Sequence, residues 1–216
     1  MKKNLSNLIF IISVVVLAGY GLWHYGLSGK SDGSHYPGSP VTGRKALFFG
    51  DHLLAPTHLQ DPDYLVKQLG EKLQLEITRE PNSFATSGEM EVQAPVALLK
   101  EKPNIVFIST GTAALKARED LGTTVSHLKK ISQEFQKNGV FVVHLGINPP
   151  GVGDNWSMGI SHTCREIPIL CIDDIFANHY TPEHSQDLAM PQEAYQLAVE
   201  KIVAAVSPYL KLSSVP

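Results

Sequence analysis

Short apolar runs alternate with longer segments of helical period over most of the chain. The apolar runs predict strands at residues 46–49, 75–78, 104–109, 140–145 and 167–172. Apolar positions at helical spacing predict helices at residues 62–73, 90–101, 123–138, 156–164 and 191–210. The last three strands are continuous apolar stretches, which is typical of strands buried on both faces. Strands that alternate with helices favour a parallel sheet covered by helices on both faces.

The N-terminus carries an apolar segment of a different kind. Two lysines precede a nearly uninterrupted apolar run over residues 8–23, between a signal-peptide core and the ~20 residues of a spanning helix. The run continues past Ala18, a possible cleavage point, so residues 1–25 favour an uncleaved signal anchor over a cleaved signal peptide. The lysines predict a single-pass protein of the inner (plasma) membrane, with its C-terminal part in the periplasm or outside.

Composition sets the domain plan and excludes one class of partner. Residues 26–43 are rich in Gly, Ser and Pro, which predicts a flexible linker before one domain at residues 44–212. The net charge is -3, and no cluster of Lys and Arg interleaves with aromatic residues. Nucleic acid is therefore not expected as a partner. Cys164 and Cys171 are candidates for one disulfide in an exported protein, with two separately buried thiols as the alternative.

Four sequence blocks carry a resemblance to a known family. In chain order they are Gly50-Asp51-His52, residues 82–90, Gly111-Thr112-Ala113 and residues 187–191. Their order and spacing resemble those of the SGNH (GDSL) hydrolases, in particular the bacterial thioesterase and lysophospholipase branch. The resemblance implies a three-layer α/β/α sandwich, flavodoxin-like, with a parallel sheet of about five strands. In such folds the site lies at the carboxyl ends of the strands.

The positions that the resemblance makes catalytic are altered. His52 stands where the family has its serine nucleophile, Thr112 where it has an oxyanion-binding asparagine, and Met190 where it has the catalytic histidine. Asp187 is retained, as is Gly88, whose N–H the resemblance assigns to the oxyanion hole. A serine hydroxyl becomes nucleophilic only when a base takes its proton. The family's acyl-enzyme mechanism is therefore not expected here.

Several roles remain open for the altered site. His52 and Asp187 would orient a water as a general base, or His52 would bind a metal with Asp51 or Asp187. The simpler interpretation makes His52 a polar cap without chemistry, and no cofactor is expected.

The leading hypothesis is a membrane-anchored pseudoenzyme that binds or scaffolds an envelope protein, an acyl chain or a glycan in an envelope assembly. The alternative is an esterase or acyl/acetyl transferase of altered mechanism, using His52 and Asp187 on lipid or exopolysaccharide. A third possibility is a structural subunit of a membrane complex, held mainly through its anchor helix.

Overall fold

The computed structural model describes most of the chain after residue 40. The described residues are 41–50, 59–80, 84, 86–110, 114, 117–148, 154–177, 179–180 and 190–210, with the backbone alone at 154–158 and 161. All of them lie within one compact unit, Gly33–Pro216. Among the helices in these ranges, none combines the length and the apolar character needed to cross a membrane. The predicted anchor at residues 8–23 and nearly all of the predicted linker lie outside the described residues.

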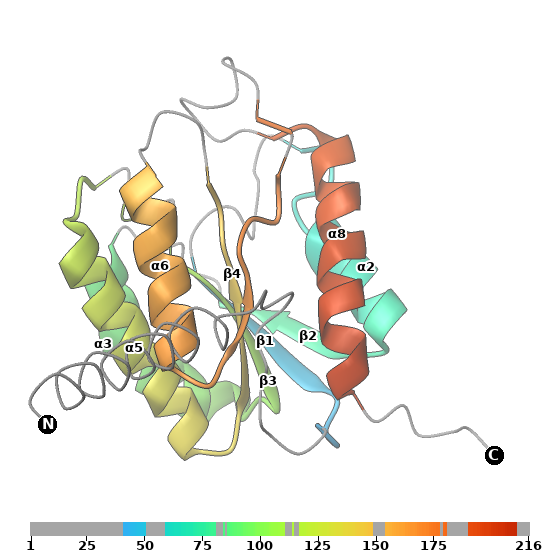
Figure 1. The fold of residues 1–216 in the computed structure, drawn as a ribbon. Coiled ribbons are helices and arrows are strands. Elements are labelled where there is room, and N and C mark those ends of the chain that lie inside the picture. Colours follow the sequence, from blue (N-terminus) through green and yellow to red (C-terminus); the bar gives the residue numbers. More distant parts are fainter. Residues whose placement is uncertain are drawn as a thin grey trace, which may run out of the picture. The chain divides into compact units, whose positions relative to one another are not determined.

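Five strands form one parallel sheet in the order β2-β1-β3-β4-β5. They are β1 (Lys45–Gly50), β2 (Glu76–Arg79), β3 (Ile105–Ser109), β4 (Phe141–Leu145) and β5 (Leu170–Ile172). The helices are α2 (Tyr64–Leu73), α3 (Ser87–Glu101), α5 (Leu121–Lys137), α6 (Asp154–Glu166) and α8 (Gln192–Val206), followed by the short 3₁₀ helix η3 (Ser207–Tyr209). Helices α2 and α8 cover one face of the sheet, and α3, α5 and α6 cover the other (Figure 1). The predicted three-layer sandwich is confirmed.

Each face of the sheet has its own apolar core because side chains alternate along a strand. Phe48 of β1 faces α2 and α8, whereas its neighbour Phe49 faces α3 and α5. Phe48 stacks on Phe107 of β3 with ring centroids 4.8 Å apart. Phe49 meets Phe135 of α5 edge to face at 5.6 Å. Strand β1 thus contributes aromatic side chains to both apolar cores.

Helix α3 begins at Ser87, three residues before the predicted start. The Thr86 side chain accepts a hydrogen bond from the Glu89 N–H at 3.2 Å and so caps the helix. Thr86 and Glu89 have the spacing of a capping box. The sequence contained this signal, but the prediction used only the apolar period.

Strand β5 is shorter than predicted at residues 167–172. Helix α6 continues to Glu166, and the Ile167 N–H donates to the Thr163 carbonyl oxygen at 3.1 Å. Pro168 has no N–H and disfavours a helical conformation at Ile167. The chain therefore turns at residues 167–169, and the strand is limited to Leu170–Ile172.

Glycine is required where two strands reach the carboxyl edge of the sheet. A Cβ atom at Gly50, the last residue of β1, would lie 2.3 Å from the Ser109 carbonyl oxygen. A Cβ atom at Gly146, just after β4, would lie 2.2 Å from the Asp173 carbonyl oxygen. No other residue permits such close backbone approach. The missing side chains let neighbouring backbone segments approach closely where the candidate site begins.

Candidate functional site

The predicted site lies at the carboxyl edge of the sheet. Strands β1 and β3 are neighbours, with Gly50 opposite Ser109, so the segments that carry His52 and Thr112 leave adjacent strands. His52, Thr112 and Asp187 themselves lie outside the described residues. Their roles, including the predicted pairing of His52 with Asp187, stay predictions.

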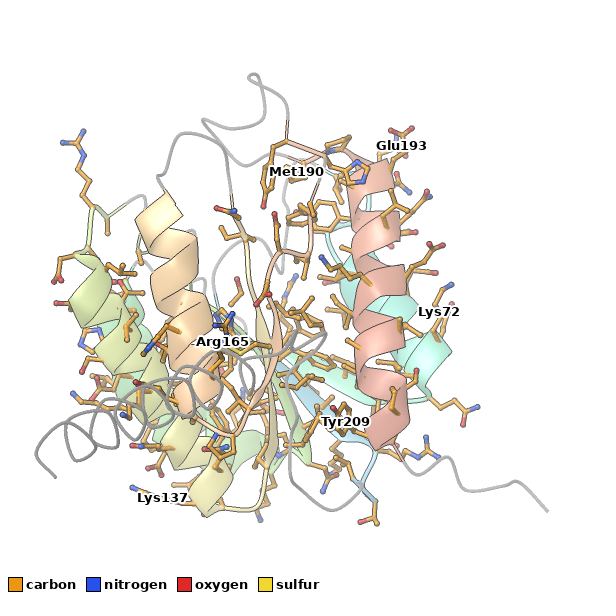
Figure 2. The ribbon with its side chains drawn as sticks, in the orientation of Figure 1. Lys72, Lys137, Arg165, Met190, Glu193 and Tyr209 are labelled. Carbon is orange, nitrogen blue, oxygen red and sulfur yellow. A yellow bond between two sulfur atoms is a disulfide. The ribbon has the colours of Figure 1, made fainter. Side chains whose placement is uncertain are left out.

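Met190, which the resemblance places at the family's catalytic histidine, is among the described residues. It lies just before α8 (Figure 2), and its side chain is fully buried. Its side chain belongs to the apolar core on the α2/α8 face, together with Phe176 and Ala194. A buried thioether has no group that takes a proton from a nucleophile at neutral pH. At this position the chain therefore supplies packing and no base.

Gly88 is the second residue of α3. An added Cβ atom would lie 3.4 Å from Cε1 of His127, a residue of α5, so the imidazole packs beside the glycine. The oxyanion role of Gly88 stays a prediction, because Thr112, its expected partner, lies outside the described residues.

A polar cluster that was not predicted joins the start of α3 to α5. The Ser87 hydroxyl donates to Glu119 Oε2 at 2.6 Å and lies 2.7 Å from His127 Nδ1. The Ser87 N–H also donates to the Glu119 carboxylate, at 3.2 and 3.3 Å to its two oxygens. Thr124 of α5 adds a third donor, at 3.1 Å from Glu119 Oε2. Glu119 thereby places a negative charge at the positive end of the α3 dipole.

The cluster contains the residue types of a hydrolase triad in a different order. In a triad the imidazole lies between the hydroxyl and the carboxylate and takes the hydroxyl proton. Here the Ser87 hydroxyl lies between Glu119 and His127 and gives its single proton to Glu119. His127 Nδ1 must then donate to Ser87 Oγ, so it does not act as a base toward it. Ser87 is also fully buried, which makes the cluster a clamp between helices.

A second link joins the same two helices one turn further along. Glu91 of α3 lies 3.1 Å from Lys130 Nζ of α5 and 3.6 Å from His127 Nε2. His127 therefore contacts both Ser87 and Glu91 of α3. Ser87 is separated from Glu119 and His127 by 32 and 40 residues, so these contacts could not be predicted from local sequence. The only local indication of a role for Glu119 was its position just before a predicted helix.

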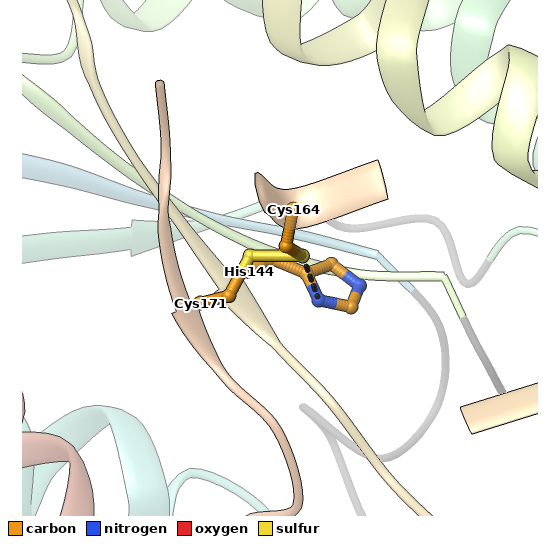
Figure 3. Close-up of side chains that lie close together, drawn as sticks. All are labelled: His144, Cys164 and Cys171. Carbon is orange, nitrogen blue, oxygen red and sulfur yellow. Dashed lines mark hydrogen bonds between the residues drawn. A yellow bond between two sulfur atoms is a disulfide. The ribbon is translucent and has the colours of Figure 1, made fainter. Parts of the chain in front are cut away.

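Cys164 of α6 and Cys171 of β5 are joined by a disulfide with Cα atoms 6.0 Å apart. His144 of β4 lies beside it, with Nδ1 3.9 Å from the Cys164 sulfur (Figure 3). His144 Nε2 lies 3.4 Å from the Thr110 hydroxyl. Burial lowers the pKa of His144 to about 4, so the imidazole is neutral at neutral pH.

These three residues are also the described group that most resembles a metal site. Their ligand atoms lie within 4.8 Å of one another, and two cysteines with a histidine form a set that zinc uses. A cysteine binds zinc only as a thiolate, however, and these two sulfurs are bonded to each other. In its disulfide form the group offers a metal a single imidazole nitrogen, which does not fit a resident metal.

A pair of hydrogen bonds connects the segments that follow β4 and β5 at the carboxyl edge of the sheet. The Tyr180 hydroxyl donates to Asp174 Oδ1 at 2.7 Å and accepts a hydrogen bond from the Asn148 N–H at 3.0 Å. Burial, and then the hydrogen bond to Asp174, raises the pKa of Tyr180 far above its usual value. The phenol stays neutral and ties together the segments that follow the two strands.

Solved structures that align with this chain include proteins of the G-D-S-L family and esterases. The crystal structure of TesA aligns with a TM-score of 0.68 and 19% identity over 77% of this chain and 99% of TesA. A lipolytic protein of the G-D-S-L family from Desulfitobacterium hafniense DCB-2 gives 0.62 and 19% over 76% and 99%. Axe2, an acetylxylan esterase from Geobacillus stearothermophilus, gives 0.60 and 12% over 79% and 98%.

These likenesses establish the fold: the chain has the α/β architecture of the SGNH (GDSL) hydrolases, as the four sequence blocks implied. No protein-family model and no curated protein matches the chain. At 12–19% identity the agreement concerns the fold alone, and the activity has to be argued from the site.

Proposed function

We propose that this protein is a membrane-anchored, extracytoplasmic pseudoenzyme that binds or scaffolds within an envelope assembly. The burial of Met190 carries the proposal. The position that should present a catalytic base to the substrate instead contributes a side chain to the core. A protein that had exchanged its base for another polar group would keep that position open to the site.

Two further features support a place outside the cytoplasm. Disulfides persist in oxidising compartments and are rare in the cytosol, and Cys164 is joined to Cys171. The apolar run at residues 8–23 follows two lysines, which favours an anchor with the domain outside.

The similar structures indicate which ligands to test first. They include a lipolytic protein and an acetylxylan esterase, so acyl chains and acetylated glycans are the first small-molecule candidates. An envelope protein is the candidate macromolecular partner. Binding without turnover would use the same edge of the sheet, beyond β1 and β3.

The test is hydrolysis of short-chain p-nitrophenyl esters by the purified chain. We expect no activity above background from protein whose fold is verified by circular dichroism. His52→Ala and Asp187→Ala are measured in parallel, with His162→Ala as the matched control, because the His162 side chain is 72% exposed on α6.

Activity that His52→Ala and Asp187→Ala both abolish, and that His162→Ala retains, would overturn the proposal. It would establish the alternative, an esterase or acyl transferase rebuilt on these two residues. If no activity is found, ligand-induced shifts of the melting temperature identify which acyl or glycan compound the folded protein binds.

A further inference from the structure

Three large apolar side chains lie exposed on α3. Val92, Val96 and Leu99 are 71%, 56% and 74% exposed. The other large apolar residue exposed in the described part of the chain is Leu197 of α8, at 44%. The spacing i, i+4, i+7 places the α3 residues on one stripe, within an arc of about 60°. They form a continuous apolar surface, which we call the α3 stripe.

The opposite side of the same helix is apolar as well. Met90, Ala94, Ala97 and Leu98 are buried in the core between α3, α5 and the sheet. A helix that is apolar on opposite sides is typical of a buried helix and not of a surface helix. Helix α3 therefore has one face for its own core and a second face suited to a partner.

Two charges beside the stripe indicate which partner fits. Glu89 lies near the N-terminal end of α3 and Lys100 near its C-terminal end, both exposed and on the same side of the stripe. They are about 16 Å apart along the helix, too far to pair within it. Lys100 contacts its neighbour Glu101 at 2.9 Å, but an exposed pair of this kind contributes little.

We propose that the α3 stripe is a self-association surface on which a second copy of the chain packs with its α3 antiparallel. Across a two-fold axis Glu89 faces the partner's Lys100, and Lys100 faces the partner's Glu89. In a parallel two-fold pair Glu89 and the partner's Lys100 would lie at opposite ends and on opposite edges of the interface, so the two could not pair. Opposed helix dipoles add to the preference for the antiparallel arrangement.

The two-fold axis that pairs the charges also brings the apolar side chains of the two α3 stripes together. The midpoint of Val92 and Leu99 lies about one residue, or about 1.5 Å, from the midpoint of Glu89 and Lys100. The surface is therefore self-complementary, as a two-fold interface requires. One helix pair is small beside the ~1,600 Å² of a standard interface, so the dimer is reversible.

The first test is disulfide trapping in the full-length chain. Its two native cysteines are joined to each other, so Val96→Cys introduces a single free thiol close to the proposed axis. Mild oxidation should convert Val96→Cys into a covalent dimer. Leu197→Cys is the matched control, an exposed apolar position on the other face of the sheet. Equal trapping at the two positions, or none at Val96→Cys, would reject the surface.

Charge reversal tests the orientation. In the Val96→Cys background, Glu89→Lys creates two repulsive pairs and should weaken association about tenfold, the equivalent of about 1.4 kcal/mol. Adding Lys100→Glu restores both pairs with exchanged signs and should recover the dimer. Trapping that Glu89→Lys leaves unchanged, or that the double variant fails to recover, contradicts the antiparallel pairing.

Two other occupants give different results. If residues 8–23 of the same chain cover the stripe, Val96→Cys will cross-link within one chain to a cysteine placed at Ala18. If a bilayer covers it, Val92→Asp will reduce binding to phosphatidylglycerol vesicles without changing self-association. Either result rejects the dimer, and neither depends on whether the protein hydrolyses esters.

Discussion

The helices on the two faces of the sheet pack against it through different kinds of side chain. On the α2/α8 face, the buried side chains of both helices are aliphatic or aromatic. On the opposite face, the helices and β4 bury polar groups: Ser87, Thr124, Ser132, His144 and Thr163. An apolar core depends mainly on filled volume, whereas buried polar groups depend on particular partners. The first face should respond to changes in volume, and the second to changes in charge and hydrogen bonding.

Met190→Ala should produce the largest loss of stability, because it opens a cavity on the α2/α8 face. Met190 is fully buried, and truncation of a buried Met to Ala costs about 2–5 kcal/mol. Leu197→Ala, at an exposed position of α8, should change the free energy of unfolding by about 0.5 kcal/mol or less. Urea unfolding of the two variants measures both values. Similar losses in both would mean that Met190 does not pack as described.

The α2/α8 face was also the part most accessible from sequence. Apolar periodicity is a local signal, and it located α8 and the strands to within a few residues. The resemblance carried by the four blocks implied a parallel sheet of about five strands, but the order β2-β1-β3-β4-β5 was known only from the structure, because periodicity alone does not rank strands. The resemblance drew attention to Met190 as the residue at the family's histidine position, and that assignment stays a prediction; its complete burial was seen only in the structure.

The opposite face was harder to predict because its contacts join distant residues. Ser87 meets Glu119 and His127 across 32 and 40 residues, and His144 meets Cys164 across 20. A single sequence shows neither which polar side chains are buried nor which face one another. The exposed α3 stripe was not predicted either. When a helix has apolar residues on two opposite sides, the apolar periodicity no longer indicates which side faces the core.

The second prediction is that the free energy of unfolding depends on pH through His144, which is buried on the polar face. The folded state holds the pKa of His144 at about 4, and an unfolded histidine titrates near 6.5. Between these values the unfolded chain binds the extra proton, so stability is lost as the pH falls from 6.5 toward 4. At pH 5 the loss amounts to about 2 kcal/mol relative to neutral pH.

His144→Gln should remove this pH-dependent contribution, and His162→Gln, at an exposed position, should leave it in place. Free energies of unfolding at pH 7 and pH 5, with the disulfide intact, supply the comparison. The same loss in His144→Gln as in the unmodified chain would show that another group titrates in this window.

The third prediction compares two buried serines on the polar face. Ser87→Ala removes a hydroxyl that contacts Glu119 and His127 and should cost about 1–3 kcal/mol, because the Glu119 carboxylate loses a donor. Ser132 Oγ of α5 is buried, and no described residue hydrogen-bonds to it. Ser132→Ala should therefore be neutral or slightly stabilising, since no partner is left unpaired. Thermal unfolding of the two variants decides whether this face is stabilised by specific contacts: equal effects at both positions would mean that volume alone governs it, as on the α2/α8 face.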